Sequence, residues 1–138
     1  MKMPSVIGAA LAAVAFTVAL PGVAQGTGEA ITPNFDHAIP NIPGRSLTAV
    51  VVDYAPGGAS PPYKHAKSAF IYAYVVSGSI ESQVNNGPKL VYHAGESFVE
   101  EPGAIHRVSR NASNTRPAKL LAVFVVDTDD KPLTSPAE

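Results

Sequence analysis

The chain has 138 residues, which is enough for one domain of ordinary size. It contains no cysteine, and this excludes both disulfide bonds and a lipid anchor attached through a thiol. Ten Lys and Arg residues against 11 Asp and Glu residues give a net charge of −1. Because no basic cluster is present to meet phosphates, we expect no nucleic-acid partner.

The first 24 residues have the pattern of a signal peptide. Lys2 supplies a positive start, residues 6–20 are almost unbroken apolar, and Gly22-Val23-Ala24 offers the small side chains that precede a cleavage site. The apolar run is shorter than the roughly 20 residues that cross a bilayer. We therefore expect cleavage after Ala24 and a periplasmic or secreted protein without a stable membrane anchor, with a retained anchor as the alternative.

Residues 25–45 are rich in Pro, Gly, Asn and Thr, with prolines at positions 33, 40 and 43. Proline fixes φ and lacks an N–H donor, so this spacing excludes a helix or a central strand. The pattern predicts an extended arm, and a flexible linker is the alternative.

After Gly44 the chain consists of short β-branched and aromatic runs separated by turn residues, which predicts an all-β domain over residues 46–127. Turn signals such as Ser77-Gly78 and Pro102-Gly103 stand between the runs. The spacing favours a sandwich or a closed barrel. Residues 128–138 are polar and are expected to form a flexible tail. The expected strands are residues 47–54, 70–76, 79–84, 89–92, 97–100, 105–109 and 119–126.

Two of these runs, residues 70–76 and 120–126, are apolar at nearly every position, whereas a half-exposed strand alternates with polar residues. Phe70, Tyr72 and Tyr74 fall on one face because side chains alternate along a strand. A second sheet, the arm or another subunit could cover that face. We expect a homodimer.

Two of the four histidines stand at positions where a barrel can aim a side chain inward. His65 follows Pro61-Pro62 just before an apolar strand, and His106 follows Pro102-Gly103 at the start of another. Imidazole is the commonest metal ligand and a proton carrier near neutral pH. His37 and His93 have no such setting and are left out of the predicted site.

These surroundings resemble the two motifs of the cupin superfamily. The first motif has the form G-x5-H-x-H, followed by a Glu; within the run from Gly58 to His65, Tyr63 stands at the first His and His65 at the second, and counting back from Gly78 puts Ile71 at the usual Glu. The second motif keeps Gly95, Gly103 and His106, with Glu101 in place of a Pro and Asn111 one residue late.

The resemblance implies a single cupin-type double-stranded β-helix, or jelly-roll barrel, over residues 47–126. It also implies a divalent metal such as Fe, Mn, Ni or Zn, which cupins bind through three His and one Glu. Of that set, only His65 and His106 are present at matching positions.

Two further residues are candidates to complete the metal site. Tyr63 could supply a phenolate once a metal had lowered its pKa. Alternation places Glu96 and Glu100 on one face of their strand and Glu101 on the other. An inward Glu100 would give a two-His, one-carboxylate site with open positions. The alternatives are that these acids are solvated and that the two histidines are hydrogen bonded without a metal.

Three functions follow as hypotheses. The first is an exported cupin that binds a small molecule in its barrel, with a divalent metal at His65 and His106, and that could catalyse oxygenation, isomerisation or decarboxylation. The second is a metal-free module that binds a small molecule. The third is a dimeric scaffold without catalysis.

Overall fold

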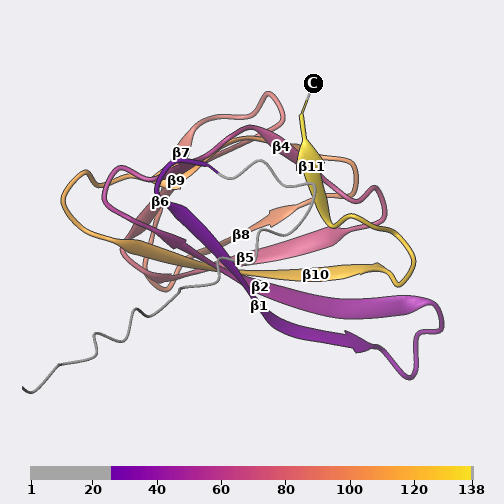
Figure 1. Ribbon diagram of the computed structural model, residues 1–138. Helices are drawn as coiled ribbons and strands as arrows, with labels where there is room; N and C mark the ends of the chain where they lie inside the picture. Colours follow the sequence, from indigo (N-terminus) through magenta and orange to yellow (C-terminus); the bar gives the residue numbers. More distant parts are fainter. Residues whose placement is uncertain (1–25, 138) are drawn as a thin grey trace, which may run out of the picture.

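The computed structural model describes residues 26–137, and these form two antiparallel sheets that face each other (Figure 1). The five-stranded sheet has the order β1-β2-β10-β5-β8, and the six-stranded sheet has the path β11-β4-β9-β6-β7 with β3 beside β9. The predicted signal peptide, residues 1–24, lies outside the described residues. The strands are β1 Glu29–Ala38, β2 Arg45–Tyr54, β3 Ala59–Ser60, β4 Tyr63–His65, β5 Phe70–Ser77, β6 Ser79–Val84, β7 Leu90–His93, β8 Ser97–Glu100, β9 Ile105–Asn111, β10 Ala118–Asp127 and β11 Thr134–Pro136.

The all-β prediction is confirmed, and each of the seven expected strands is present within two residues of its expected bounds. The turn at Gly78 shows why the breaks fall where they do. Gly78 has a φ of 72°, and a Cβ there would lie 2.5 Å from the carbonyl oxygen of Pro117. Only glycine accommodates both the left-handed backbone and this close approach, so β5 ends there and β6 enters the opposite sheet.

The expected arm is a strand for half its length. Residues 29–38 form β1, which pairs with β2 at the edge of the five-stranded sheet. The register shifts between Pro33 and Phe35. A proline is tolerated at an edge strand or a bulge, because no ladder hydrogen bond is then needed from its nitrogen. Residues 29–38 are thus a strand in the sheet of their own chain.

The tail differs from the flexible segment that we expected. Thr134–Pro136 form β11, which pairs with β4. Leu133 packs against the buried cluster that contains Ile71 and Phe124. Burial of one leucine on that cluster and the backbone bonds of the short ladder together hold the segment, although its composition is polar.

The core lies between the sheets in two clusters. One gathers around Tyr54, Val75 and Ile80, and the other around Ile71 and Phe124. Alternation within β10 buries Leu120, Ala122 and Phe124 on the inner face. No helix among residues 26–137 is long and apolar enough to span a membrane.

Candidate metal centre

Three strands bring the side chains of His65, Glu100 and His106 together inside the barrel. His65 ends β4, Glu100 ends β8 and His106 is the second residue of β9. One donor atom from each of the three lies within 4.8 Å of the other two. Glu100 and His106 are 2% and 1% exposed. This group of two imidazoles and one carboxylate could hold a metal ion.

Cross-strand register explains the convergence. Tyr63 faces His106 across β4 and β9, and Ile71 faces Glu100 across β5 and β8. Residues directly opposite in antiparallel strands project to the same side of the sheet. Glu100 therefore extends into the space next to Ile71, the position at which the cupin motif has its Glu. The carboxylate comes from the neighbouring strand.

Glu100 sits between the two histidines. Its Oε2 lies 3.2 Å from His65 Nε2, and its Oε1 lies 3.2 Å from His106 Nδ1. Burial alone would raise the pKa of Glu100, but the contacts with His106 and His65 outweigh it and lower that pKa to about 2. Glu100 is thus a carboxylate at neutral pH, which is the form that binds a cation.

The residues present fit a metal ion. His65 Nδ1 lies 3.0 Å from the Thr134 hydroxyl, and His106 Nε2 lies 2.7 Å from the Ser82 hydroxyl. A hydroxyl on one ring nitrogen fixes the ring and leaves the other nitrogen as a ligand. Glu100 Oε1 is buried and has no hydrogen-bond partner, since its contact with His106 lacks hydrogen-bond geometry. An unpaired buried carboxylate oxygen beside His65 Nε2 and His106 Nδ1 suits a cation, which would take the place of the contacts that these nitrogens make with Glu100 and Tyr63.

Tyr63 belongs to the same cluster but contacts a histidine. Its hydroxyl lies 2.8 Å from His106 Nδ1. Burial, with the nearby Tyr54 and Glu100, raises the pKa of Tyr63 well above its usual value. This arrangement favours a neutral phenol that hydrogen bonds His106 over the phenolate ligand considered from the sequence.

The other candidates lie apart from this cluster. His93 and His37 are exposed, and His37 Nδ1 contacts its neighbour's carbonyl at Ala38. The Glu96 carboxylate accepts the backbone N–H of His93, and Glu101 is exposed. Sequence reasoning missed Ser82 and Thr134, because neither hydroxyl has a sequence signal for a contact with a histidine far along the chain.

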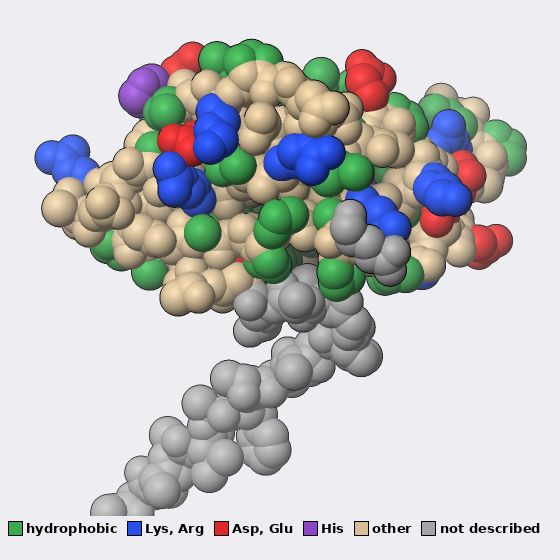
Figure 2. Space-filling model, turned by 90° about the horizontal axis from the view of Figure 1, so that it is seen from above, with side chains coloured by type: hydrophobic (Ala, Val, Ile, Leu, Met, Phe, Trp, Pro, Cys, Tyr) green, Lys and Arg blue, Asp and Glu red, His purple; other side chains and the backbone are tan. Residues whose placement is uncertain are grey.

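The cluster lies in the wall of a cavity of about 280 Å³. The rest of the wall is largely apolar, with Val50, Val52, Leu120 and Phe124 from the five-stranded sheet. Residues 131–136 form another part of the wall, and Glu29 and Lys131 add two charged groups. On the face seen in Figure 2, Lys and Arg side chains are spread over the surface, with Asp and Glu side chains between some of them.

Both the fold and the motif positions define a cupin. The family described as "Cupin domain" matches residues 50–124, more than half of the chain, and the chain belongs to that family.

Among curated relatives, germin-like protein subfamily 2 member 2 of Arabidopsis thaliana is 31% identical over 112 residues, covering 78% of this chain and 50% of the relative. Subfamily 2 member 4 of the same plant is 28% identical over 109 residues, covering 75% and 49%. The chain spans about half the length of these relatives.

Solved structures agree with this assignment. An oxalate oxidase superposes with a TM-score of 0.62 at 25% identity, covering 80% of this chain and 56% of that one. A conserved protein with a double-stranded β-helix domain from Klebsiella pneumoniae has a TM-score of 0.62 at 18% identity, covering 86% and 90%. The second likeness supports the double-stranded β-helix fold alone.

Proposed function

We propose that this cupin binds one divalent metal ion through His65, Glu100 and His106, and that it binds a small organic acid in the adjoining cavity. The observation that carries the proposal is the buried Glu100 carboxylate. Its Oε1 has no hydrogen-bond partner, and one ring nitrogen of His65 and one of His106 lie within 4.8 Å of a Glu100 carboxylate oxygen and of each other. A bound divalent metal would supply Lewis-acid or oxygen-activating chemistry. Oxygenation, isomerisation and decarboxylation are the reactions to test.

The organic acid is supported by two features. Lys131 gives the cavity a positive charge and is in none of the ion pairs formed within residues 26–137. Oxalate oxidase in complex with glycolate superposes with TM-scores of 0.60–0.61 at 25–26% identity. This chain has Tyr63 and Ile71 where the cupin motif has a His and a Glu. We therefore do not propose that it shares the substrate of oxalate oxidase.

Metal analysis tests the first half of the proposal. The mature protein is purified without chelators or an affinity-tag metal, and its metal content is compared with that of a His65→Ala, His106→Ala variant. We expect about one divalent ion per chain and its loss in the variant. A His37→Ala, His93→Ala variant, which removes two exposed histidines, is the matched control and should keep the metal.

A metal-free binding module is the second candidate. It is favoured by the hydrogen bond from Tyr63 to His106 and by the Glu100 contacts, which partly satisfy the polar groups without an ion. Absence of metal from both the wild type and the control variant would support this function and overturn the first.

We also propose export and dimerisation. Export rests on Lys2 and the apolar run at residues 6–20, as argued from the sequence. Dimerisation rests on the outer face of the five-stranded sheet. One apolar row crosses all five strands of this face through Phe35, Ala49, Val123, Tyr72 and Val99, which are successive register partners.

A second row lies beside the first, through Leu47, Val125 and Phe70. Phe70, Tyr72 and Val99 are 39%, 43% and 48% exposed, and β1 extends the sheet without covering them. Such a face measures roughly 20 by 24 Å, or about 500 Å² in projection. Because side chains protrude from the sheet, the accessible area of this face is larger than its projected area. It approaches the roughly 800 Å² per partner of a standard interface. A second copy, which carries the same apolar face, is the occupant that we propose.

A further inference from the structure

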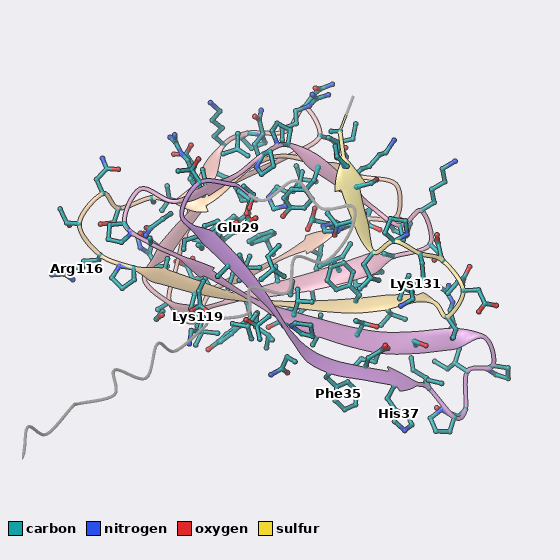
Figure 3. The ribbon with its side chains drawn as sticks, viewed as in Figure 1. Glu29, Phe35, His37, Arg116, Lys119 and Lys131 are labelled. Atoms are coloured by element: carbon teal, nitrogen blue, oxygen red, sulfur yellow. The ribbon has the colours of Figure 1, made fainter. Side chains whose placement is uncertain are left out.

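The cavity contains a second carboxylate, which the metal site does not use. Glu29, the first residue of β1, lines the cavity, and its side chain is drawn toward the space between the sheets in Figure 3. Its Oε1 accepts the N–H of Gly26, and its Oε2 accepts the hydroxyl of Ser60. These two bonds fix the carboxylate against the cavity wall.

A chain of hydroxyls leads to Glu29 and points at it. Ser60 donates to Glu29, so its oxygen accepts from Tyr54 at 2.6 Å. Tyr54, having used its only hydrogen, accepts from Ser109 at 2.8 Å. Each hydroxyl has one donor hydrogen, so the direction of the whole chain is set by the carboxylate at its end. This direction is the one that an ionised Glu29 sets, because a carboxylate only accepts hydrogen bonds.

No described cation balances this charge. Within residues 26–137, the ion pairs with an Asp or Glu partner involve Asp53, Glu81, Glu100 and Asp127, and Glu29 is in none of them. Figure 3 shows Lys131 far to the right of Glu29, on another part of the cavity wall. Burial raises the pKa of Glu29 above its ordinary value, against the lowering effect of the Gly26 hydrogen bond. A partly buried carboxylate without a cation costs free energy, and a bound cation would offset that cost.

We propose that Glu29 and Ser60 form a second polar anchor in the cavity, which binds the primary ammonium group of a small ligand. The wall next to Glu29 supports a short apolar body, because Ile31, Val52 and Leu120 line the same cavity. This anchor does not depend on a metal at His65, Glu100 and His106. If the proposed function also holds, the ligand class is a small organic acid that carries an amine.

The segment that holds Glu29 is built tightly. Gly26 lies against β3, where a Cβ would be 1.8 Å from the Ala59 carbonyl oxygen. The Ala55 N–H bonds to the Gly28 carbonyl, and the Ala59 N–H bonds to the Thr27 carbonyl. The anchor is therefore preorganised before a ligand arrives.

The test uses n-butylammonium as the probe and n-butanol as its neutral counterpart. Both are titrated into the metal-free protein, and binding is followed by NMR chemical shifts of the cavity residues. We expect butylammonium to bind about tenfold more weakly to Glu29→Gln than to the wild type, as for loss of one charged hydrogen bond. Butanol should bind both proteins equally.

Glu96→Gln, which changes an exposed glutamate, is the control and should bind butylammonium as the wild type does. If Glu29→Gln does not fold, Glu29→Asp replaces it, because one methylene fewer withdraws the carboxylate and should weaken binding. Equal butylammonium affinity in the wild type and the folded Glu29 variant would overturn the proposal. So would no butylammonium binding to the wild type. Since the protein is tested without metal, these results leave the metal proposal to its own experiment.

Discussion

Ile71 on β5 and Glu100 on β8 are directly opposite each other in neighbouring antiparallel strands. Both are almost fully buried, at 1% and 2% exposure. The position at which the cupin motif has its Glu is therefore apolar, and the carboxylate stands across the strand pair. If the two residues changed places, as in Ile71→Glu with Glu100→Ile, the total volume and charge of the pair would stay the same.

This relationship gives the first prediction. Glu100→Gln should lower the affinity for a divalent metal at least tenfold, because the carboxylate charge is lost while the shape is kept. The double exchange Ile71→Glu, Glu100→Ile should recover much of the affinity. Metal affinity is measured by competition with a chelating dye. Glu101→Gln, one residue along and exposed, should bind as the wild type does, and a Glu100→Gln variant with unchanged affinity would remove Glu100 from the site.

Loss of the Tyr63 hydroxyl should destabilise the protein. Tyr63→Phe keeps the ring but removes the hydrogen bond to His106 Nδ1. We expect a loss of about 1 kcal/mol in the free energy of unfolding, measured with urea on the metal-free protein. Tyr92→Phe is the control, since Tyr92 packs against Phe98 through its ring. An equal loss in both variants would show that the Tyr63 bond adds nothing.

The proposed dimer makes a prediction about molecular mass. Tyr72→Lys places a charge within the outer apolar row and should convert a dimer into a monomer, as measured by sedimentation equilibrium. Arg107→Glu changes an exposed residue of β9 in the other sheet and should leave the mass unchanged. A monomeric wild type at high concentration would contradict the dimer, and a wild-type dimer that Tyr72→Lys leaves intact would place the interface elsewhere.

A fourth prediction concerns the loop after β10. The hydroxyl and backbone N–H of Ser68 donate to Asp130, and these hydrogen bonds lower the pKa of Asp130. A carboxyl group whose pKa is lower in the folded state stabilises the fold above its unfolded pKa, and this contribution is lost as pH falls through the folded value. Asp130→Asn should therefore reduce the melting temperature at pH 7, and the difference from the wild type should shrink as pH falls below about 4. A difference that is independent of pH would contradict the assignment.

The sequence predicts the central strands well, because alternation and turn residues act locally. Residues 79–84 and 97–100 match their strands in both bounds. The same alternation puts Glu100 and Glu101 on opposite faces, and the structure shows that the face of Glu100 is the inward one. Strand β1 is hard to predict from the sequence because it contains Pro33. A proline is tolerated in a strand at the edge of a sheet, but the sequence does not show which strand lies at an edge.

The rest depends on contacts between distant parts of the chain. Strand β11 has three residues and no alternation, so its pairing with β4 leaves no local signal. The Thr134 contact with His65 joins residues 69 apart. The apolar outer face of β5 could be predicted, but the absence of any cover for it among residues 26–137 could be found only from the structure.

The contact between β11 and β4 also makes the proposed metal site depend on residues 133–136. A chain folded only as far as β10 already carries His65, Glu100 and His106. It still lacks the Thr134 hydroxyl that orients the His65 ring, and the strand that borders β4. Before β11 pairs with β4, the cavity lacks the wall that residues 131–136 form, and the His65 ring lacks its contact with Thr134. The proposed metal site therefore takes the form described here only once β11 is paired with β4.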